Sequence, residues 1–215
     1  MKVIITGATG MVGEGVLLEC LENKAVKNVL MINRKSSPIK HPKLTELIVP
    51  NFMNLDAFDN VLTGYDACFY CAGISSVGMD EAKYTQITYD TTLNFASKLA
   101  TLNPEMVFTY VSGSHTDSSE KGKIMWARVK GKTENDLMKL PFKRVYNYRP
   151  GFMKPFKEQK NVKPFFKPII LLFPILFPKK TLTLKQVGQA MINNVLHRYS
   201  KQILEIEDIK IVAKN

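Results

Sequence analysis

The chain has 215 residues, of which 45% are hydrophobic, and its formal net charge is +11 at pH 7. This length allows one buried α/β core with a small addition and excludes two full domains. The longest apolar run, at residues 168–178, is too short for a membrane-spanning helix, and the first residues do not have the pattern of a signal peptide. We therefore expect a cytoplasmic protein.

The most informative stretch lies at the start of the chain. An apolar strand at residues 3–5 leads directly into Thr6-Gly7-Ala8-Thr9-Gly10-Met11-Val12-Gly13. This pattern is typical of a strand, turn and helix that bind a dinucleotide pyrophosphate. Gly7 permits the tight turn, Gly10 lets the backbone approach the phosphates, and Gly13 lets the helix pack closely on the strand. The first N–H groups of the helix then hold the negative charge.

Hydrophobic periodicity predicts the remaining elements. Further strands are expected at residues 29–32, 44–49, 67–71, 106–111, 144–149 and 203–206, and helices at residues 55–62, 80–102, 125–138 and 184–197. This alternation predicts an α/β Rossmann fold with a doubly wound parallel sheet. We assign residues 1–151 to the nucleotide-binding domain and residues 152–215 to a small C-terminal lid or substrate region that packs on the same domain. Ligands of such sheets bind beyond the carboxyl ends of the strands, so these residues should converge there: Gly7, Arg34, Gly73, Ser112, Pro150 and Gly151.

The end of the second strand indicates which nucleotide is bound. An NAD-selective site needs a carboxylate there, which binds the ribose 2′-hydroxyl. This chain has Asn33, followed by Arg34 and Lys35. A guanidinium can grip a 2′-phosphate that a carboxylate would repel, so we expect NADP(H) to be preferred over NAD(H). The alternative is that Arg34 and Lys35 are solvated loop residues.

The three cysteines do not form a metal-binding pattern. Cys68 and Cys71 lie three apart on an expected strand, so their side chains point to opposite faces, and no second pair of ligands accompanies them. We expect no metal and, with Cys20, free thiols in a reducing compartment.

Further short motifs follow the glycines in a familiar order. They are Cys71-Ala72-Gly73, Tyr110-Val111-Ser112, Lys130 and Arg149-Pro150-Gly151. With them, the first 151 residues or so resemble the atypical, extended-type short-chain dehydrogenase/reductase superfamily, in the branch of the Tat-interacting-protein-like, NmrA-like and NAD-dependent epimerase/dehydratase proteins. The resemblance implies an NAD(P) cofactor held by Gly7, Thr9, Gly10, Met11, Val12, Gly13, Arg34, Lys35, Cys71, Ala72, Gly73, Lys130, Pro150, Gly151 and Phe152.

The catalytic set of that superfamily is Ser, Tyr and Lys, with the last two as Tyr-x-x-x-Lys on one helix. Spacing of four residues puts both side chains on one face, so the lysine can hold the nicotinamide ribose and lower the tyrosine pKa. The resemblance implies Ser112, Lys130 and, at the tyrosine position, Trp126. An indole N–H donates a hydrogen bond but does not release a proton near neutral pH.

Two functions follow from this departure. The first is an NADP(H)-dependent oxidoreductase or epimerase-like enzyme acting on a small, apolar carbonyl compound, with a proton from Tyr84, His115 or water. The second is a non-catalytic sensor of the NADPH/NADP+ ratio, which Trp126 favours. We favour the enzyme, on the strength of Ser112 and Lys130.

Positive charge is concentrated between residues 121 and 185, a stretch that contains seventeen Lys and Arg residues and three acidic residues. Such a surface binds phosphate-bearing ligands or anionic lipid, or is a solvated basic face, and the absence of a nucleic-acid-binding motif argues against nucleic acid. The apolar, lysine-flanked residues 163–180 would cover a substrate pocket, touch a membrane surface or form a subunit contact. We therefore expect an unidentified small-molecule substrate and, through residues 163–180, a weak peripheral membrane or protein contact.

Overall fold

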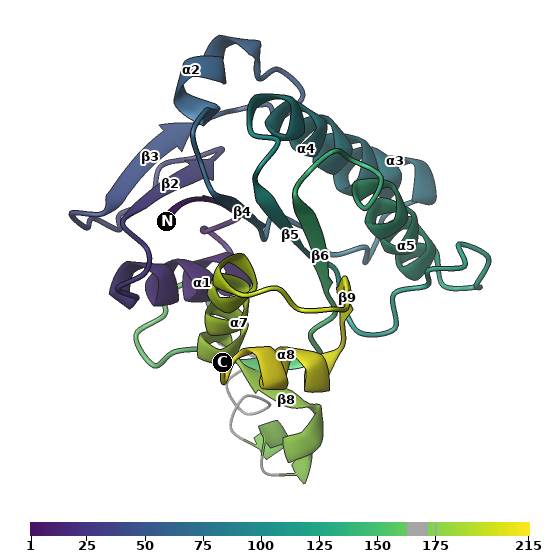
Figure 1. Ribbon diagram of the computed structural model, residues 1–215. Helices are drawn as coiled ribbons and strands as arrows, with labels where there is room; N and C mark the ends of the chain where they lie inside the picture. Colours follow the sequence, from purple (N-terminus) through teal and green to yellow (C-terminus); the bar gives the residue numbers. More distant parts are fainter. Residues whose placement is uncertain (163–171, 175) are drawn as a thin grey trace.

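A computed structural model describes residues 1–162, 172–174 and 176–215. These residues form a seven-stranded sheet in the order β3-β2-β1-β4-β5-β6-β9, in which every neighbouring pair is parallel (Figure 1). The strands are β1 (Lys2–Thr6), β2 (Asn28–Asn33), β3 (Leu44–Ile48), β4 (Ala67–Tyr70), β5 (Val107–Val111), β6 (Arg144–Tyr148) and β9 (Ile203–Leu204). This order is that of a doubly wound nucleotide-binding sheet, and the predicted fold class is confirmed.

Helices cover both faces of the sheet, as Figure 1 shows. They are α1 (Met11–Glu22), α2 (Asp59–Leu62), α3 (Glu81–Thr85), α4 (Thr91–Leu102), α5 (Met125–Leu137), α7 (Leu184–Leu196) and α8 (Ile206–Val212). One apolar cluster joins α1, α7 and α8 to strand residues such as Ile5, and the other joins α4 and the end of α5 to residues such as Ile4. Alternate strand residues thus enter opposite layers, as the two-residue period of a strand requires.

Helix α7, in the C-terminal part of the chain, belongs to the same helical layer as α1. Gly188 lies so close to α1 that a Cβ built on it would be 2.7 Å from the Cβ of Glu19. Thr183 and Gln186 form a capping box that fixes where α7 begins. Helix α7 packs on α1, and β9 pairs with β6, so these two elements of the C-terminal part adjoin the main sheet and its helices.

Two expected elements differ in detail. The helix expected at residues 80–102 consists of α3, a π-helical turn (Gln86–Asp90) and α4, and the N–H and Oγ1 of Thr91 both donate to the Gln86 carbonyl oxygen. The strand expected at residues 203–206 ends at Leu204. Glu205 and Asp208 form a capping box there, so the chain turns directly into α8, which periodicity did not predict.

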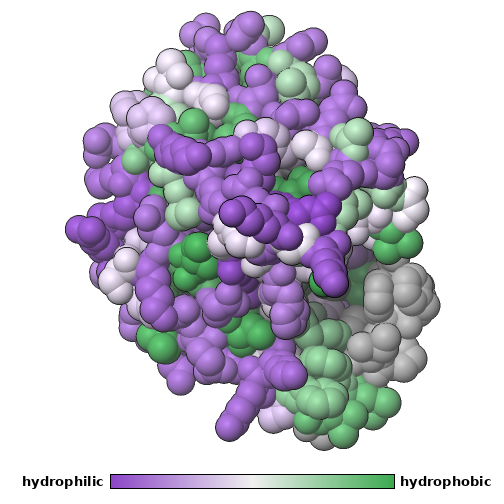
Figure 2. Space-filling view, turned by 90° about the vertical axis from the view of Figure 1, so that its right-hand side faces the viewer, coloured by the Kyte–Doolittle hydropathy of each residue, from purple (hydrophilic) through white to green (hydrophobic). Residues whose placement is uncertain are grey.

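A smaller structure follows β6. The described residues form a two-stranded parallel sheet from β7 (Phe152–Lys154) and β8 (Thr181–Thr183). Most of the expected lid, residues 163–171 and 175, lies outside the described residues, and among its described members Leu172, Leu176 and Phe177 are exposed. Figure 2 shows apolar residues gathered at one edge of a mainly hydrophilic face, next to the residues drawn in grey. None of the helices described is long and apolar enough to cross a membrane.

Candidate functional site

The glycine-rich turn between β1 and α1 forms one wall of the candidate site. Gly7 has a φ of 71°, in the left-handed region that favours glycine, and a Cβ there would lie 2.6 Å from the backbone of Ala72. A Cβ on Gly13 would lie 2.2 Å from the Gly7 carbonyl oxygen, so the helix packs directly on the turn. Among the described residues, no side chain caps the first N–H groups of α1. These groups and the helix dipole form a site for an anion of phosphate size. The other predicted residues of this turn are exposed or partly exposed: Thr9, Gly10, Met11 and Val12.

The end of β4 lies against this turn. The Ala72 N–H donates to Thr6 Oγ1 at 3.2 Å and so ties the ends of β1 and β4 together. Gly73 follows in an exposed position, and a Cβ built on it would meet no atom of the described part of the chain within 4 Å. Burial raises the pKa of the Cys71 thiol to about 12, so this thiol stays protonated at neutral pH. The described part of the chain contains no cluster of three His, Cys, Asp or Glu side chains that could hold a metal ion.

A carboxylate on β3 holds the loop after β2 through hydrogen bonds. Glu46 accepts hydrogen bonds from Asn33 Nδ2 at 3.1 Å and from the Ser37 N–H at 2.8 Å. Partial burial alone would raise the pKa of the Glu46 carboxyl, but these hydrogen bonds outweigh it and lower the pKa. Arg34 and Lys35, between the two anchored residues, are exposed. The loop therefore presents two cations from a fixed backbone.

Ser112 comes directly after β5, and its hydroxyl is directed into the protein. Oγ donates to the Glu134 carboxylate and lies 3.2 Å from the Tyr148 carbonyl oxygen. The residue is only 7% exposed, and Glu134 on α5 is completely buried. Because interior partners occupy the hydroxyl, its contact with a substrate carbonyl stays a prediction.

Trp126 and Lys130 lie one turn apart on α5, beside the end of β5. Lys130 Nζ donates to the Ser112 carbonyl oxygen at 2.6 Å. Burial lowers the pKa of Lys130 to about 8, against the opposite effect of the nearby Glu134 charge. Trp126 is partly exposed, and its Cζ3 would lie 3.9 Å from a Cβ built on Gly113. The helix thus brings an indole and a lysine with a lowered pKa to the same strand end.

Arg149, the residue after β6, forms a buried ion pair with Glu134. Its Nε donates to the two carboxylate oxygens at 3.0 and 3.2 Å, and its Nη2 also donates to Glu134 and to Ser118 Oγ. Its Nη1 lies 3.3 Å from an oxygen of Glu205. The Arg149 side chain is 11% exposed and that of Glu134 is 0% exposed. This network joins the ends of β5, β6 and β9 to α5.

The predicted residues after β6 lie close to the loop that follows β5. The Pro150 carbonyl oxygen accepts a hydrogen bond from the Ser114 N–H at 3.1 Å. Gly151 is enclosed, because a Cβ on it would lie 2.8 Å from the Ile206 side chain of α8. Phe152 begins β7 and is partly exposed. Close packing therefore accounts for a glycine at position 151 without any cofactor.

A strap formed by residues 155–161 crosses the start of α1. Gln159 Nε2 donates to the Met11 carbonyl oxygen at 2.7 Å. The N–H groups of Lys160 and Asn161 donate to the two carboxylate oxygens of Glu14 at 2.9 and 2.8 Å. Glu14 lies in the first turn of α1 and is 3% exposed. The C-terminal part of the chain is therefore fastened to the helix that carries the glycine turn.

The alternative proton donors occupy different environments. Tyr84 is 1% exposed and burial raises the pKa of its phenol, which argues against proton exchange with a bound substrate. His115 is exposed on the loop after β5, with a φ of 68°.

This geometry agrees with a family match. Residues 3–130 match the model of the NAD dependent epimerase/dehydratase family, which is more than half of the chain and includes the glycine turn, Ser112 and Lys130. The chain belongs to this family. The predicted resemblance to the epimerase/dehydratase branch is confirmed, and with it a site of the type that binds NAD(P).

Individual relatives are more distant. The chain is similar to Protein fmp52, mitochondrial, of Aspergillus clavatus, with 28% identity over 74% of this chain and 70% of that protein. It is also similar to Protein HTATIP2 of Rattus norvegicus, with 26% identity over 71% of this chain and 62% of that protein. Because fmp52 is named as mitochondrial, the expected cytoplasmic location stays a prediction.

Solved structures share the fold. One is the ADP-L-glycero-D-manno-heptose-6-epimerase of Helicobacter pylori, with a TM-score of 0.70 and 14% identity over 99% of this chain and 80% of that chain. Another is MoeE5 in complex with UDP-glucose and NAD, with a TM-score of 0.69 and 14% identity over 100% of this chain and 81% of that chain.

Three carboxylates that organise the site were not found from the sequence. Glu14 fastens the strap, Glu46 holds the loop after β2, and Glu134 binds Ser112 and Arg149. A signal existed for Glu134, which follows Lys130 by four residues and so lies on the same face of the helix. The partners of the other two are distant in the sequence, and periodicity does not reveal them.

Proposed function

We propose that this protein is an NADP(H)-dependent oxidoreductase or epimerase-like enzyme that acts on a small carbonyl compound. The observation that carries the proposal is the open glycine turn at the start of α1. Among the described residues, a Cβ built on Gly10 would approach the Gly7 carbonyl oxygen alone, at 3.4 Å, and one built on Gly73 would have no neighbour within 4 Å. A dinucleotide pyrophosphate fits such a turn, since backbone N–H groups face it and side chains do not fill it.

Arg34 is the residue to which we assign recognition of the 2′-phosphate, with Lys35 beside it. Both side chains are exposed, and the neutral Asn33 occupies the position where an NAD-selective site has its carboxylate. The Glu46 oxygens are engaged by the loop donors. A guanidinium and an ammonium at this position favour a ligand with the additional phosphate.

We assign the proton transfer to Lys130. The cofactor supplies or accepts a hydride when bound, and the substrate oxygen must then gain or lose a proton. With a pKa of about 8, Lys130 is mostly protonated at pH 7, which suits a general acid. In carbonyl reduction Nζ gives its proton to the substrate oxygen, and in the reverse direction the neutral amine takes one from the substrate hydroxyl. Trp126 covers this end of β5 and donates at most a hydrogen bond.

A second candidate function is a non-catalytic sensor of the NADPH/NADP+ ratio. The specific observation in its favour is the inward hydroxyl of Ser112, which leaves the site without the serine contact of the related enzymes. Trp126 in place of tyrosine points in the same direction.

Trp126 is the only tryptophan, so its emission tests nucleotide binding directly. We expect NADPH to quench it at lower concentrations than NADH, and Arg34→Gln to remove most of this preference, with Lys27→Gln as the control. Turnover of NADPH with a carbonyl panel, lost in Lys130→Met, would support the enzyme. Different affinities for NADPH and NADP+ with no turnover would support the sensor. If calorimetry detects no nucleotide binding, both proposals are wrong.

A further inference from the structure

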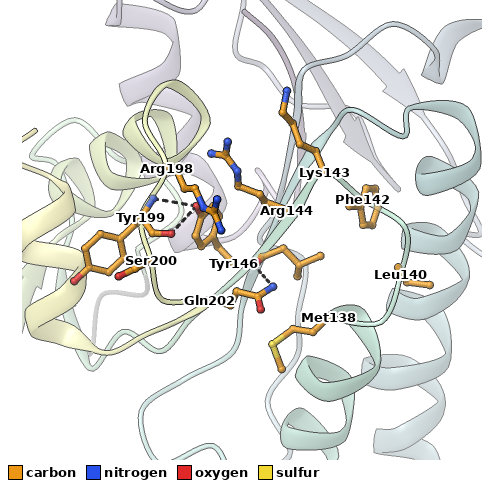
Figure 3. Close-up of a pocket in the computed structure, with 11 residues that line it drawn as sticks. Met138, Leu140, Phe142, Lys143, Arg144, Tyr146, Arg198, Tyr199, Ser200 and Gln202 are labelled. Carbon is orange, nitrogen blue, oxygen red and sulfur yellow. Dashed lines mark hydrogen bonds between the residues drawn. The ribbon is translucent and has the colours of Figure 1, made fainter.

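We propose that a cationic pocket at the amino end of β6 binds a small phosphorylated molecule that carries a planar or apolar group. The pocket has a volume of about 240 Å³ and lies between the loop after α5 and the loop between α7 and β9 (Figure 3). Its principal lining residues are Phe142, Lys143, Arg144, Tyr146, Arg198 and Tyr199.

The pocket is separate from the cofactor crevice. Arg144 is the first residue of β6, whereas the glycine turn, Ser112 and Arg149 lie at the carboxyl ends of the strands. Because the strands are parallel, the pocket lies at the amino ends of the strands and the cofactor crevice at their carboxyl ends. The residues that line the pocket include none of those assigned above to the cofactor or to catalysis.

An excess of positive charge is the main property of this pocket. Lys143, Arg144 and Arg198 line it, and its lining includes no acidic residue. Lys143 is paired at 3.1 Å with Glu105, whose side chain is 84% exposed. Among the described residues, neither arginine side chain takes part in an ion pair or a hydrogen bond. Two cations in one recess repel each other, and a bound dianion would replace this repulsion by attraction.

The two guanidinium groups come from different parts of the chain. Arg144 belongs to β6 and Arg198 follows α7, and both are among the lining residues drawn in Figure 3. Guanidinium groups bind phosphate through paired N–H donors in a fixed plane, which makes a phosphate monoester the anion of best fit.

The walls of the pocket are held by bonds within the protein. The Tyr146 hydroxyl accepts from the Tyr199 N–H and donates to the Tyr199 carbonyl oxygen, both at 3.2 Å. Gln202 Nε2 donates to the Val145 carbonyl oxygen at 3.3 Å, and the Asn147 N–H donates to the Gln202 carbonyl oxygen at 2.7 Å. The loop is thereby fastened to β6 before any ligand arrives, which lowers the entropic cost of binding.

Size and lining define the rest of the ligand. Pockets for drug-sized molecules have volumes of about 300–1,000 Å³, so this recess suits a smaller compound. Phe142 and Tyr146 give it an aromatic side next to the cations. A nucleic acid backbone would need an extended basic track, whereas this charge is gathered in one recess. A compact phosphate ester would place its phosphate by the cations and its planar or apolar part against the aromatic side of the pocket.

Calorimetric titration with phenyl phosphate at low ionic strength tests the proposal. We expect one site per chain, weaker binding of inorganic phosphate, and at least tenfold weaker binding of phenyl phosphate to the double variant Arg144→Gln/Arg198→Gln. The matched control is Lys24→Gln/Lys27→Gln, which removes the same charge from exposed positions before β2, four strands away in the sheet. This control should bind phenyl phosphate within twofold of the original protein.

Three results would overturn the proposal. They are unchanged binding in the arginine variant, an equal loss in both double variants, and binding that saturating NADPH abolishes, which would place the ligand in the cofactor crevice. Inorganic phosphate that binds as tightly as phenyl phosphate would contradict the role of the aromatic wall. NADPH affinity should stay within twofold in the arginine variant, so failure of this site is distinguishable from failure of the proposed function.

Discussion

The buried ion pair between Glu134 and Arg149 permits a quantitative prediction, for the substitution Glu134→Gln. The glutamate side chain is 0% exposed and the arginine side chain 11% exposed, and the carboxylate also accepts from Ser112. The substitution removes the negative charge and leaves the arginine charge with Ser118 and the half-exposed Glu205 as partners.

The expected loss of stability is large. Removing one partner of a buried pair costs about 3–5 kcal/mol, because the remaining charge stays desolvated. For a chain of this size, about 1 kcal/mol corresponds to roughly 2–4 °C, so the melting temperature should fall by about 6–20 °C. Replacing both partners by apolar residues, as in Glu134→Leu/Arg149→Met, should recover most of the loss, since no buried charge then remains.

Urea unfolding followed by circular dichroism measures this free energy, and scanning fluorimetry measures the melting temperature. The control is Glu81→Gln, which breaks an ion pair at the surface. In this pair Arg128 Nη2 lies 2.7 Å from a carboxylate oxygen of Glu81, whose side chain is 53% exposed. A surface pair of this kind contributes about 0–1 kcal/mol. If Glu134→Gln is no more destabilising than Glu81→Gln, the ion pair does not hold the strand ends together and our reasoning is wrong.

Three further predictions concern the crevice. Trp126→Tyr should change the rate of NADPH-dependent carbonyl reduction by less than about threefold, because Lys130 already supplies the proton, and a rise of about 10²–10⁴ would show that the original crevice lacks a general acid. The rate of reduction should be highest below the Lys130 pKa of about 8 and fall as pH rises through it, because the reactive form is protonated, and a profile unchanged in Lys130→Met would exclude this assignment. Glu14→Gln should speed limited proteolysis of residues 155–161, because the amide has one acceptor oxygen for two N–H donors and no charge, whereas the exposed Glu22→Gln should not.

Periodicity predicts β1, β2, β4, β5 and β6 well, because each is a largely apolar run buried in the middle of the sheet, whereas β3 is an edge strand with a mixed sequence. The glycine turn is predicted for a different reason, since only glycine allows the close approach of Gly7 to Ala72. What periodicity misses is set by local hydrogen bonds. The capping box at Glu205 starts α8 after a strand of two residues, and Thr91 creates the π-helical turn by donating twice to one carbonyl oxygen.

The site is predicted less completely than the fold. A motif shows which residues reach the strand ends, and Trp126 and Lys130 do lie together beside β5. The direction of a side chain, however, depends on its partners, and the Ser112 hydroxyl turns inward to donate a hydrogen bond to Glu134. Contacts between distant segments, such as that of Glu14 with the strap, arise only when the chain has folded.

The contacts of Lys130 and Glu134 do not involve the side chain of residue 126. Trp126, Lys130 and Glu134 are spaced by four residues and lie on one face of α5. Lys130 is held by the Ser112 carbonyl oxygen and Glu134 by Arg149, and neither bond involves the indole. These two contacts therefore do not depend on the identity of residue 126. A change in rate after Trp126→Tyr would consequently report the proton donor itself, provided that NADPH affinity stays the same.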